Sequence, residues 1–572
     1  INSSNKINID SVIKYKKKYP QTYIIQRIND CDKPRGLKNV LDPLHLKGFQ
    51  IADHVVFVSS WVYQYFKDNY SFNQRYSIIN NGCNIKVFKN MKEKCPRIKN
   101  IKIVSHHWST NYNKGFEFYN ALDKIMSKRK DIEFTFICKD YCKEYKPKNI
   151  KVIGPFCGQQ LAQEINKHDI YLTASKFESC PNHVLEGLAC GLPVIYHTDL
   201  GGGIEICQDY GISFTNMEEL LLAIEKMKNN YTCYYEKLKK DNEQSKFCSH
   251  KCSQKYVDTY NQLWLHKVSQ WTHKIENRDY RWSLKGYKVC RLGSLSLFLK
   301  LGTILDSYTS IDNNRIVSII NKIKNKEDIF SSEFTNKLTI IAEHRQCLSA
   351  LYNRQITLKL KPSIFKYYKK PLFFMNDKSW SNPWAAGAQL SHYLFFCQYY
   401  NQKPNLIEDV LQDLDKYKHP NGWYYKKTSD ERRINGIMKV LTGFDFIGKQ
   451  IEKKMAIKII DSILNNNKIH GGGCSIYDLC YVIIRCQEKC PHRSQECQHF
   501  VENIYHLCLQ HQQLDGGFKY DKNSKHGKKY YGIKIVPDGF LGCVHSSVLF
   551  MNTIAMIDKF LNKRLNLKII KS

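Results

Sequence analysis

The sequence predicts a doubly wound α/β region followed by a separate, all-α region. Between residue 20 and about residue 215, short β-branched apolar runs alternate with helix-like segments, which is typical of parallel strands covered by helices. After about residue 270, amphipathic segments of helix length are separated by Gly-rich turns. At 572 residues the chain is too long for one hydrophobic core, so several domains are expected.

The apolar runs of the first region show little alternation with polar residues, as expected for strands that are buried on both faces. Each run is predicted to form one strand. In chain order they are YIIQRI at 23, HVVFVSS at 54, SIINNG at 77, KIVSHH at 102, IEFTFIC at 132, IKVIGP at 150, DIYLTAS at 169 and PVIYHT at 193.

A stretch poor in apolar residues, from Lys86 to Asn100, interrupts the pattern and predicts a linker between two α/β units. About 85 residues precede it, too few for a complete first unit, so its early strands and loops are expected to be absent from this chain. We therefore expect a partial α/β domain over 1–88, a second α/β domain over 89–268 and an all-α domain over 269–572.

The third region contains helix-length segments such as ERRINGIMKVLTGFDFIGKQ at 431. Gly-rich turns separate such segments at intervals of roughly one helical hairpin, which predicts a repeated α/α array. These turns are HPNGWYY at 419, HGGGCS at 470 and QLDGGFKY at 513.

The composition of the chain limits the classes of binding partner that are expected. The net charge of +34 reflects Lys and Arg spread along the whole chain, with no basic stripe interleaved with aromatics, so no nucleic-acid partner is predicted. Attraction to nucleotide diphosphates and peripheral association with an anionic membrane fit this charge. The 22 cysteines fall singly rather than in a spaced framework, which favours a reducing, cytoplasmic compartment.

The segment KFESCPNHVLEGLACGLPVI, residues 176–195, predicts an anion site. A helix is expected from near Pro181 to near Cys190, with Glu178 on the preceding loop and Glu186 in the second turn. Free amides at a helix start, together with the macrodipole, favour a diphosphate. The amides expected there belong to Asn182, His183 and Val184.

A carboxylate in an apolar helix costs several kcal/mol unless it is paired. For Glu186 alone, pairing with a structural Lys or Arg is the simpler interpretation. Three companions favour a binding role instead: the Gly-Leu-Pro-Val strand that follows, the DLGGGIEI turn at 199, and the Lys-Gly pair at 114.

Together these motifs resemble the donor-binding half of the family 4 glycosyltransferases, which have the GT-B fold of two Rossmann-like domains. The resemblance runs from about Arg27 to Trp264, with the specific motifs in residues 100–215. It implies that Glu178 contacts the transferred sugar, that Glu186 binds the ribose through its diol, and that Lys114 binds phosphate. It further implies a nucleotide-sugar donor, no cofactor and a metal-independent reaction.

One departure from that family concerns a second phosphate ligand. Many members have an Arg after the first strand of this domain, whereas this chain has SHHWST. His106 or His107 is expected to substitute, or the role goes unfilled and both are structural. Asn29, Asp30 and Ser59 are expected near the cleft, and no catalytic base is identified.

In the third region, Asp478, Cys480 and His545 are similar to the zinc ligands of protein prenyltransferase β subunits, which are α/α toroids. Such triplets arise by chance in a chain with 22 Cys and 20 His, so we expect no metal. The toroid architecture, as in the prenyltransferase and terpenoid cyclase group, is the stronger resemblance. Residues 379–396 are expected either to line its cavity as a helical hairpin or to form packed core.

The function implied is retaining transfer of a sugar from a nucleotide sugar to a glycan, lipid or protein acceptor, with an appended α/α domain. Two alternatives stay open. One is a toroid-type lyase or transferase, with or without zinc, whose α/β part is a remnant. The other is a non-catalytic protein that binds glycan or lipid.

Overall fold

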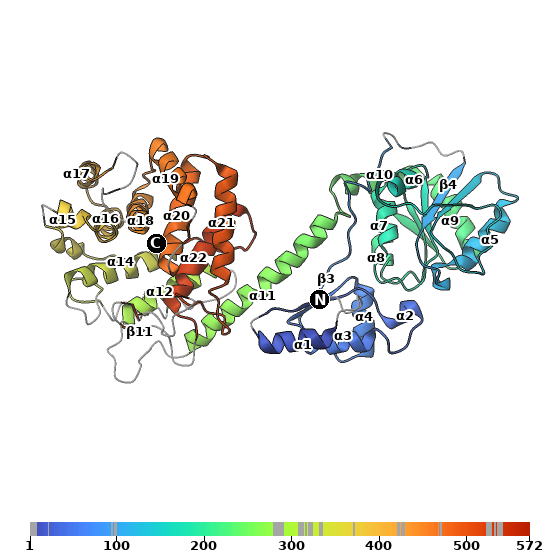
Figure 1. Cartoon of the computed structure of the whole chain (residues 1–572), viewed down its shortest axis with the longest axis horizontal. Helices are drawn as coiled ribbons and strands as arrows, with labels where there is room; N and C mark the ends of the chain where they lie inside the picture. Colours follow the sequence, from blue (N-terminus) through green and yellow to red (C-terminus); the bar gives the residue numbers. More distant parts are fainter. Residues whose placement is uncertain are drawn as a thin grey trace. The chain divides into compact units, whose positions relative to one another are not determined.

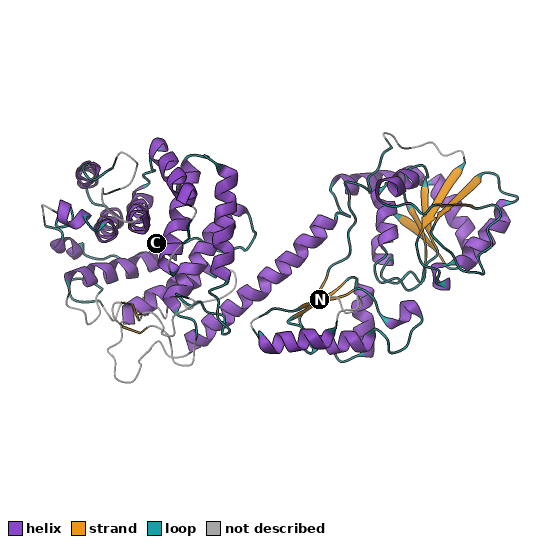
Figure 2. Ribbon diagram, in the orientation of Figure 1, coloured by secondary structure: helices purple, strands orange, loops and turns teal. Residues whose placement is uncertain are grey.

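Packing divides the chain into two units, Ile1–Leu263 and Trp264–Ser572. The first contains two parallel sheets and the second is rich in helices (Figure 1 and Figure 2). The computed structural model describes residues 8–20, 22–92, 95, 100–277, 291–306, 314, 317–318, 324–330, 336–369, 372–419, 424, 430–466, 468–469, 472–521, 529–530, 533–534 and 541–571.

The first sheet has three parallel strands in the order β1-β2-β3. Its strands are short because the β-branched runs that form them are short, and Phe57 of the middle strand packs against Phe66 in a fully buried core. The elements of this part are α1 (Ile9–Lys18), β1 (Ile25–Ile28), α2 (Asp32–Arg35), α3 (Asp42–Phe49), β2 (His54–Phe57), α4 (Ser60–Asn69) and β3 (Tyr76–Ile78).

The second sheet has six parallel strands in the order β6-β5-β4-β7-β8-β9. In its register, Ile103 lies opposite Phe134 on one side and Ile170 on the other. The strands are β4 (Ile101–His106), β5 (Ile132–Ile137), β6 (Lys151–Ile153), β7 (Ile170–Thr173), β8 (Val194–His197) and β9 (Gly211–Phe214). The helices are η1 (Tyr112–Lys114), α5 (Phe116–Met126), α6 (Gly158–Ile165), α7 (Asn182–Ala189), α8 (Ile204–Cys207), α9 (Met217–Asn229) and α10 (Tyr231–Glu243).

All eight predicted strands are present, and the doubly wound α/β prediction is confirmed. β9 was not predicted from the sequence, because its four residues, GISF, are too few and too rich in Gly and Ser to form a recognisable apolar run. Gly211 is needed there because a Cβ would lie 2.0 Å from the carbonyl oxygen of Val194.

The strand order of this sheet creates a topological switch point between β4 and β7. From β4 the chain moves outward to β5 and β6, then returns to the other side of β4 with β7, β8 and β9. Loops that follow β4 and β7 therefore diverge at the carboxyl edge and leave a crevice, the usual ligand position in open α/β sheets.

The described part of the predicted linker packs against α10 and against the residue that precedes β7. Asn90 donates a hydrogen bond to the Tyr235 hydroxyl at 3.0 Å, and Lys92 lies 3.7 Å from Asp169. Residues 93–94 and 96–99 lie outside the described residues. The boundary between the two units falls at Leu263, inside α11 (Ser249–Asn277), compared with the expected boundary at 268.

The second unit is mostly helical, with one small antiparallel ribbon, β10 (Lys529–Tyr530) and β11 (Ile533–Lys534), so the all-α prediction needs that correction. Its helices are α12 (Arg291–Ile304), α14 (Lys337–Asn353), η2 (Ser363–Tyr367), α15 (Asp377–Trp380), α16 (Pro383–Tyr399), α17 (Pro404–Asp415), α18 (Asp430–Ile447), α19 (Lys453–Asn466), α20 (Gly473–Lys489), α21 (Ser494–Leu509) and α22 (Val544–Leu561).

Six of these helices, α12, α14, α16, α18, α20 and α22, contact one another in sequence order, and α22 closes the ring on α12. α17 packs on α16, while α19 and α21 pack on α20 (Figure 1). Among the described helices, none combines the length and apolar character needed to cross a bilayer.

Two expectations for this unit are resolved. Of the Gly-rich turns, that at 513 is present, and Gly517 leaves room for the Trp271 ring, which a Cβ would approach to 2.4 Å. Most of the turn at 419 lies outside the described residues, as do residues 470–471 of the turn at 470, whose Gly472 caps the start of α20. Residues 379–396 form no hairpin, because α15 is one turn long and α16 is a single helix.

Candidate functional site

The Lys-Gly pair fixes the loop after β4 against the end of β7. Gly115 has φ +85°, and a Cβ there would lie 2.3 Å from Cβ of Ala174. Only glycine tolerates both the left-handed backbone and this close approach. Lys114, the last residue of η1, is therefore held at the carboxyl edge of the sheet, beside the switch point.

The loop after β7 is held by the DLGGGIEI turn. The Glu178 amide donates to the Leu200 carbonyl at 2.9 Å, and the Gly202 amide donates to the Glu178 carbonyl at 2.7 Å. A Cβ on Gly202 would lie 2.0 Å from the Ser179 carbonyl oxygen and 2.3 Å from Oγ of Ser59. The run of glycines thus lets this turn press against the loop that carries Glu178.

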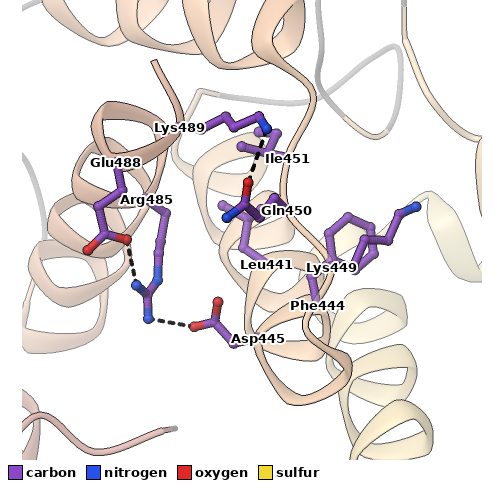
Figure 3. A pocket seen from close by; sticks show the side chains of 9 residues that line it. All are labelled: Leu441, Phe444, Asp445, Lys449, Gln450, Ile451, Arg485, Glu488 and Lys489. Carbon is purple, nitrogen blue, oxygen red and sulfur yellow. Dashed lines mark hydrogen bonds and ion pairs between the residues drawn. The ribbon is translucent and has the colours of Figure 1, made fainter. Parts of the chain in front are cut away.

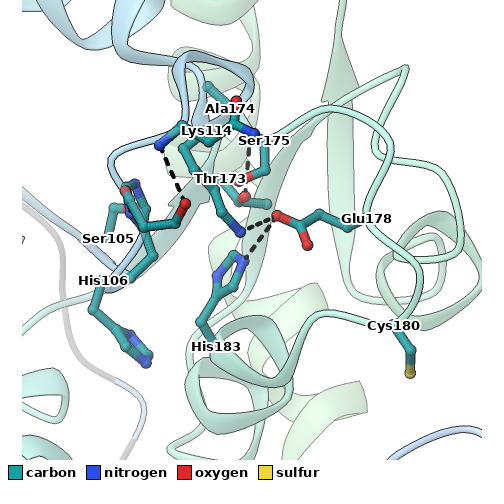
Figure 4. Close-up of polar contacts among 12 residues, drawn as sticks. Ser105, His106, Lys114, Thr173, Ala174, Ser175, Glu178, Cys180 and His183 are labelled. Atoms are coloured by element: carbon teal, nitrogen blue, oxygen red, sulfur yellow. Dashed lines mark hydrogen bonds and ion pairs between the residues drawn. The ribbon is translucent and has the colours of Figure 1, made fainter. Parts of the chain in front are cut away.

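These two loops bring Lys114 and Glu178 into contact. The Lys114 ammonium forms an ion pair with Oε1 of Glu178, and Nε2 of His183 lies 3.9 Å from the same oxygen (Figure 4). Both members of the ion pair are about four-fifths buried, with side-chain exposures of 18% and 19%. Three side chains from two separate sequence segments therefore meet at the switch point.

The electrostatics of this cluster keep Glu178 ionised. Burial alone would raise its pKa, but Lys114 and His183 outweigh burial and hold the pKa of the Glu178 carboxyl well below its usual range. Burial lowers the pKa of His183, opposed by its contact with Glu178. At neutral pH the cluster therefore holds one positive and one negative group beside a neutral imidazole.

The start of α7 supplies backbone donors, as predicted. The helix begins at Asn182 after Pro181, which provides no side-chain cap, and it ends at the Cys190 cap. Among the described residues, the amides of the first three helical residues have no acceptor. They belong to Asn182, His183 and Val184 and are oriented to bind an anion.

The surroundings of Glu186 correct the prediction that its carboxylate lacks a partner in the chain. His106 Nε2 donates to Oε2 of Glu186 at 2.7 Å, and the Glu186 side chain is 23% exposed rather than buried. The partner is a histidine at the end of β4 instead of the Lys or Arg considered from the sequence. A ribose diol would have to share or replace this contact.

A network also links the two glutamates. The Tyr171 hydroxyl lies 3.1 Å from Nδ1 of His106 and 3.0 Å from Nδ1 of His183, so it connects the partner of Glu186 to the neighbour of Glu178. Tyr171 is fully buried on β7.

Gly187 makes room for this tyrosine, because a Cβ there would lie 2.5 Å from the Tyr171 ring. The sequence analysis missed Tyr171. Its only signal was the glycine directly after Glu186, inside an otherwise apolar helix.

His107 is placed unfavourably for the predicted role in phosphate binding. Its Nδ1–H donates to the Ser109 carbonyl at 3.1 Å, and 4% of the residue is exposed. Burial, reinforced by Lys114, lowers its pKa well below the usual value. A neutral ring protonated at Nδ1 leaves Nε2 as an acceptor, so His107 as it lies has no proton to donate to a phosphate.

A second contact of the GGGIEI turn was also missed. Glu205 on α8 accepts hydrogen bonds from the Ser60 amide at 3.2 Å, from the Ser60 hydroxyl and from Asn80. It thereby caps the N-terminal end of α4 and joins the two sheets of this unit. Asn81 adds a link by donating to Oδ1 of Asn182 at 2.9 Å.

The zinc triplet of the second unit does not assemble. Among the described residues, no group of three or more His, Cys, Asp and Glu side chains is arranged to hold a metal ion. Asp478 and Cys480 lie two positions apart on α20, and residues at that spacing face different sides of a helix. Asp478 and His545 line a common cavity, and Cys480 is not among its lining residues.

Solved structures offer only distant likenesses. One is the sucrose-phosphate synthase of Thermosynechococcus elongatus, at 15% identity and a TM-score of 0.36 over 45% of this chain and 77% of that protein. Another is Anabaena HepE in complex with UDP and glucose, at 14% identity and a TM-score of 0.36 over 44% of this chain and 76% of that protein. The pneumococcal O-GlcNAc transferase GtfA in complex with UDP and GlcNAc matches at 12% identity and a TM-score of 0.33 over 44% of this chain and 54% of that protein.

None of the curated proteins matches the chain. A family model, described as Glycosyl transferases group 1, matches residues 99–230. This segment holds Lys114, Glu178 and Glu186, so the part of the chain that carries the candidate site is similar to the glycosyl transferases of group 1.

Proposed function

We propose that the chain transfers a sugar from a nucleotide-sugar donor to an acceptor, with retention of anomeric configuration, as a family 4-like glycosyltransferase. The observation that carries the proposal is the convergence of Lys114, Glu178 and the free amides of α7 at the switch point of the six-stranded sheet. Cationic and backbone donors at that position suit a diphosphate, and a carboxylate beside them suits sugar hydroxyls.

In this proposal the donor diphosphate binds between Lys114 and the start of α7. During transfer, the bond between the anomeric carbon and the diphosphate oxygen breaks, the oxygen of an acceptor hydroxyl bonds to that carbon, and the hydroxyl proton passes to the departing diphosphate. Lys114 and the amides stabilise the negative charge that grows on the departing diphosphate, so the reaction needs no metal. Glu178 contacts the sugar and is a catalytic residue in this sense.

The nucleoside is proposed to lie along α7. Glu186 binds the ribose hydroxyls through the oxygen that His106 leaves free, since the described contact involves Oε2 alone. His106, held by Tyr171, acts as a positioning residue for Glu186. His107 is assigned a packing role beside Phe116 and Phe136, because its imidazole is buried and neutral.

For the second unit we propose an α/α toroid that binds or modifies the acceptor, a glycan, lipid or protein. The closed ring of α12, α14, α16, α18, α20 and α22, with other helices packed outside it, supports this architecture. We also propose a cytoplasmic location and peripheral association with anionic membranes, in line with the net charge of +34.

The test is a thermal-shift screen of nucleoside diphosphates and nucleotide sugars. A ligand at a hundred times its Kd should stabilise the folded chain by about 2.7 kcal/mol. We expect Glu186→Ala to abolish most of the shift, while Glu218→Ala, which removes an exposed carboxylate on α9, leaves it intact. Equal shifts in both variants would rule out the ribose assignment.

A second measurement is transfer in the presence of a chelator. Binding and turnover should both persist, because Lys114 and the helix amides occupy the place of a divalent ion. Activity that disappears in chelator and returns with magnesium or manganese would contradict the metal-independent mechanism.

A further inference from the structure

The helical unit contains a cavity of about 830 Å³, within the size range of small-molecule sites. All six helices of the closed ring contribute to its lining, from Leu297 on α12 to Asn552 on α22. The segment 379–396 takes part in both alternatives considered from the sequence: Ser379, Trp384 and His392 line the cavity, whereas Leu390 and Phe396 are packed core.

Positive charge dominates the described lining. Lys300, Lys378 and Lys439 line the cavity, and Asp478 is the one carboxylate among the described lining residues. Neither Lys300 nor Lys439 forms an ion pair with a described residue. The cavity therefore has a surplus of cations that nothing in the described chain neutralises.

Lys300 shows how unusual this arrangement is. The residue is 3% exposed, and its described hydrogen bond goes to the uncharged amide oxygen of Gln346. Burial lowers its pKa well below the usual value, and repulsion from Arg345 and Lys439 adds to the effect. Because lysine is rarely buried without a partner, a buried, uncompensated lysine facing a cavity indicates an anionic ligand.

Two further lining residues, Gln389 and His392, each have a buried polar atom without a partner among the described residues, Oε1 and Nδ1 respectively. They lie three positions apart on α16 and so share one face of that helix. Burial lowers the pKa of His392 well below its usual value, with Arg345 and the cavity lysines adding to the effect. Buried polar atoms normally have partners, and a ligand would supply them here.

A smaller hollow of about 120 Å³ between α18 and α20 provides a contrast (Figure 3). There Arg485 lies 2.7 Å from Asp445 and 2.6 Å from Glu488. The cation of Arg485 is thus neutralised within the chain, whereas Lys489 donates to the uncharged amide oxygen of Gln450 at 3.0 Å. The two hollows therefore differ in burial, because the lysines of the smaller one, Lys449 and Lys489, are exposed to solvent, whereas Lys300 is buried.

We propose that the large cavity is a binding site for an anionic sugar, one that carries a carboxylate or a phosphate. Lys300 and Lys439 would hold the anionic group, and Gln389 and His392 would bond ring hydroxyls. The proposal concerns residues of the second unit alone and does not depend on the donor site proposed above.

The lining favours a sugar over a lipid chain. Hydroxyl and amide side chains are distributed among the apolar ones, including Thr339, Gln346, Ser379, Asn382 and Asn552. Several of these groups already have partners in the chain: Ser379 donates to the Phe373 carbonyl, and Asn552 bonds the Ile570 backbone. A polyhydroxyl ring can use the bonding capacity that remains, by donating or accepting, whereas a hydrocarbon chain cannot. Trp384, a lining residue that is 48% exposed, offers a flat apolar surface for one face of the ring.

The experiment titrates the full chain with glucose, glucuronate and glucose 6-phosphate, three probes that share a ring and differ in the charged group. Calorimetry and ligand-observed NMR should show at least tenfold tighter binding of one anionic sugar than of glucose. The two anions distinguish a carboxylate site from a phosphate site. Glucose binding as tightly as both anions would overturn the proposal.

Two variants locate the binding. Lys300→Met, which replaces a buried lysine by an apolar side chain of similar size, and Gln389→Glu, which adds a negative charge, should each weaken the preferred anion at least tenfold. Lys403→Met, at an exposed lysine outside the cavity lining, is the matched control and should change nothing. Thermal unfolding of each variant verifies that it is folded.

Other outcomes would overturn the proposal. If the preferred anion binds Lys300→Met and Gln389→Glu as tightly as the wild type, the cavity is not its site. If octyl phosphate binds and the three sugars do not, the ligand is an amphiphile instead. Lys114→Ala should leave anionic-sugar binding unchanged, so a failure of the proposed donor site would not be mistaken for a failure of this one.

Discussion

The ion pair between Lys114 and Glu178 leads to two opposite predictions for nucleoside diphosphate affinity. Lys114→Ala removes the cation that is proposed to bind the diphosphate. Glu178→Gln removes the negative charge that competes for the same cation and that repels an incoming phosphate. The first variant should bind a nucleoside diphosphate more weakly than the wild type, and the second more tightly.

The structure sets the expected magnitudes. A hydrogen bond to a charged group contributes about 1.5–3 kcal/mol, so Lys114→Ala should weaken binding roughly tenfold to a hundredfold. Both side chains are about one-fifth exposed, so the repulsion by Glu178 is partly screened by solvent. Its removal should contribute about 1 kcal/mol, or roughly a fivefold gain in affinity.

Calorimetric titration of the wild type and both variants at neutral pH measures these effects. Lys176→Ala is the matched control, because Lys176 forms a similar ion pair, at 2.6 Å with Glu117, just outside the cluster. Its Kd should stay within about twofold of the wild type, since surface pairs contribute little.

Two results would refute the argument. If Lys114→Ala binds the diphosphate as well as Lys176→Ala does, Lys114 is not a phosphate ligand. If Glu178→Gln weakens binding as strongly as Lys114→Ala, the carboxylate is needed to position the lysine, and its proposed role toward the sugar is wrong. Sugar transfer should be lost in Glu178→Gln even where nucleotide affinity rises.

Three further predictions concern packing and stability. Gly187→Ala should cost about 1–3 kcal/mol of unfolding free energy, measured by urea denaturation, and should weaken nucleotide binding, because the new Cβ displaces Tyr171; an unchanged midpoint would contradict this. Glu205→Ala should lower the unfolding free energy by about 1–2 kcal/mol, because it removes the hydrogen-bond acceptor at the start of α4, near Ser60. A change of less than about 0.3 kcal/mol, which is the size expected of a neutral surface substitution, would show that the link is dispensable. Lys300→Met should stabilise the chain by about 1–4 kcal/mol at pH 7. Because burial depresses the lysine's folded pKa, the wild type gains stability as the pH rises toward 10.5, and the advantage of the variant should shrink there; a pH-independent difference would argue against a depressed pKa.

The strands of the α/β region could be predicted from sequence because the burial of each strand is reflected in the composition of its own residues. A strand covered on both faces needs an apolar residue at nearly every position, and the runs ending at Phe57, His106 and Thr173 satisfy that requirement. The start and end of α7 were equally local, since Pro181 and the Gly-Leu-Pro segment mark them. β9 was not predicted because its pairing with β8, rather than its own composition, makes it a strand.

The partners within the site could not be predicted in the same way. His106 lies 80 positions before Glu186, and nothing in either segment shows that the two residues meet. Tyr171 bridges two histidines because β7 pairs with β4, which ends at His106, and contacts α7, which carries His183; both contacts depend on the long-range fold. The closure of α22 on α12 is likewise a long-range contact, and the charged cavity depends on it.

The two glutamates show why a motif can be recognised before its local chemistry is known. Each carboxylate already has a cationic or protonated neighbour in the chain, Lys114 for one and His106 for the other. A donor that binds here therefore exchanges one set of hydrogen bonds for another instead of forming the first hydrogen bonds to an unpaired charge. Such an exchange involves a smaller free-energy change than first contact would, above all at Glu178, because most of the desolvation of that carboxylate has already occurred during folding. Affinity should consequently depend more on the diphosphate, which gains the free amides of α7, than on the sugar, whose contact with Glu178 competes with the existing Lys114 ion pair.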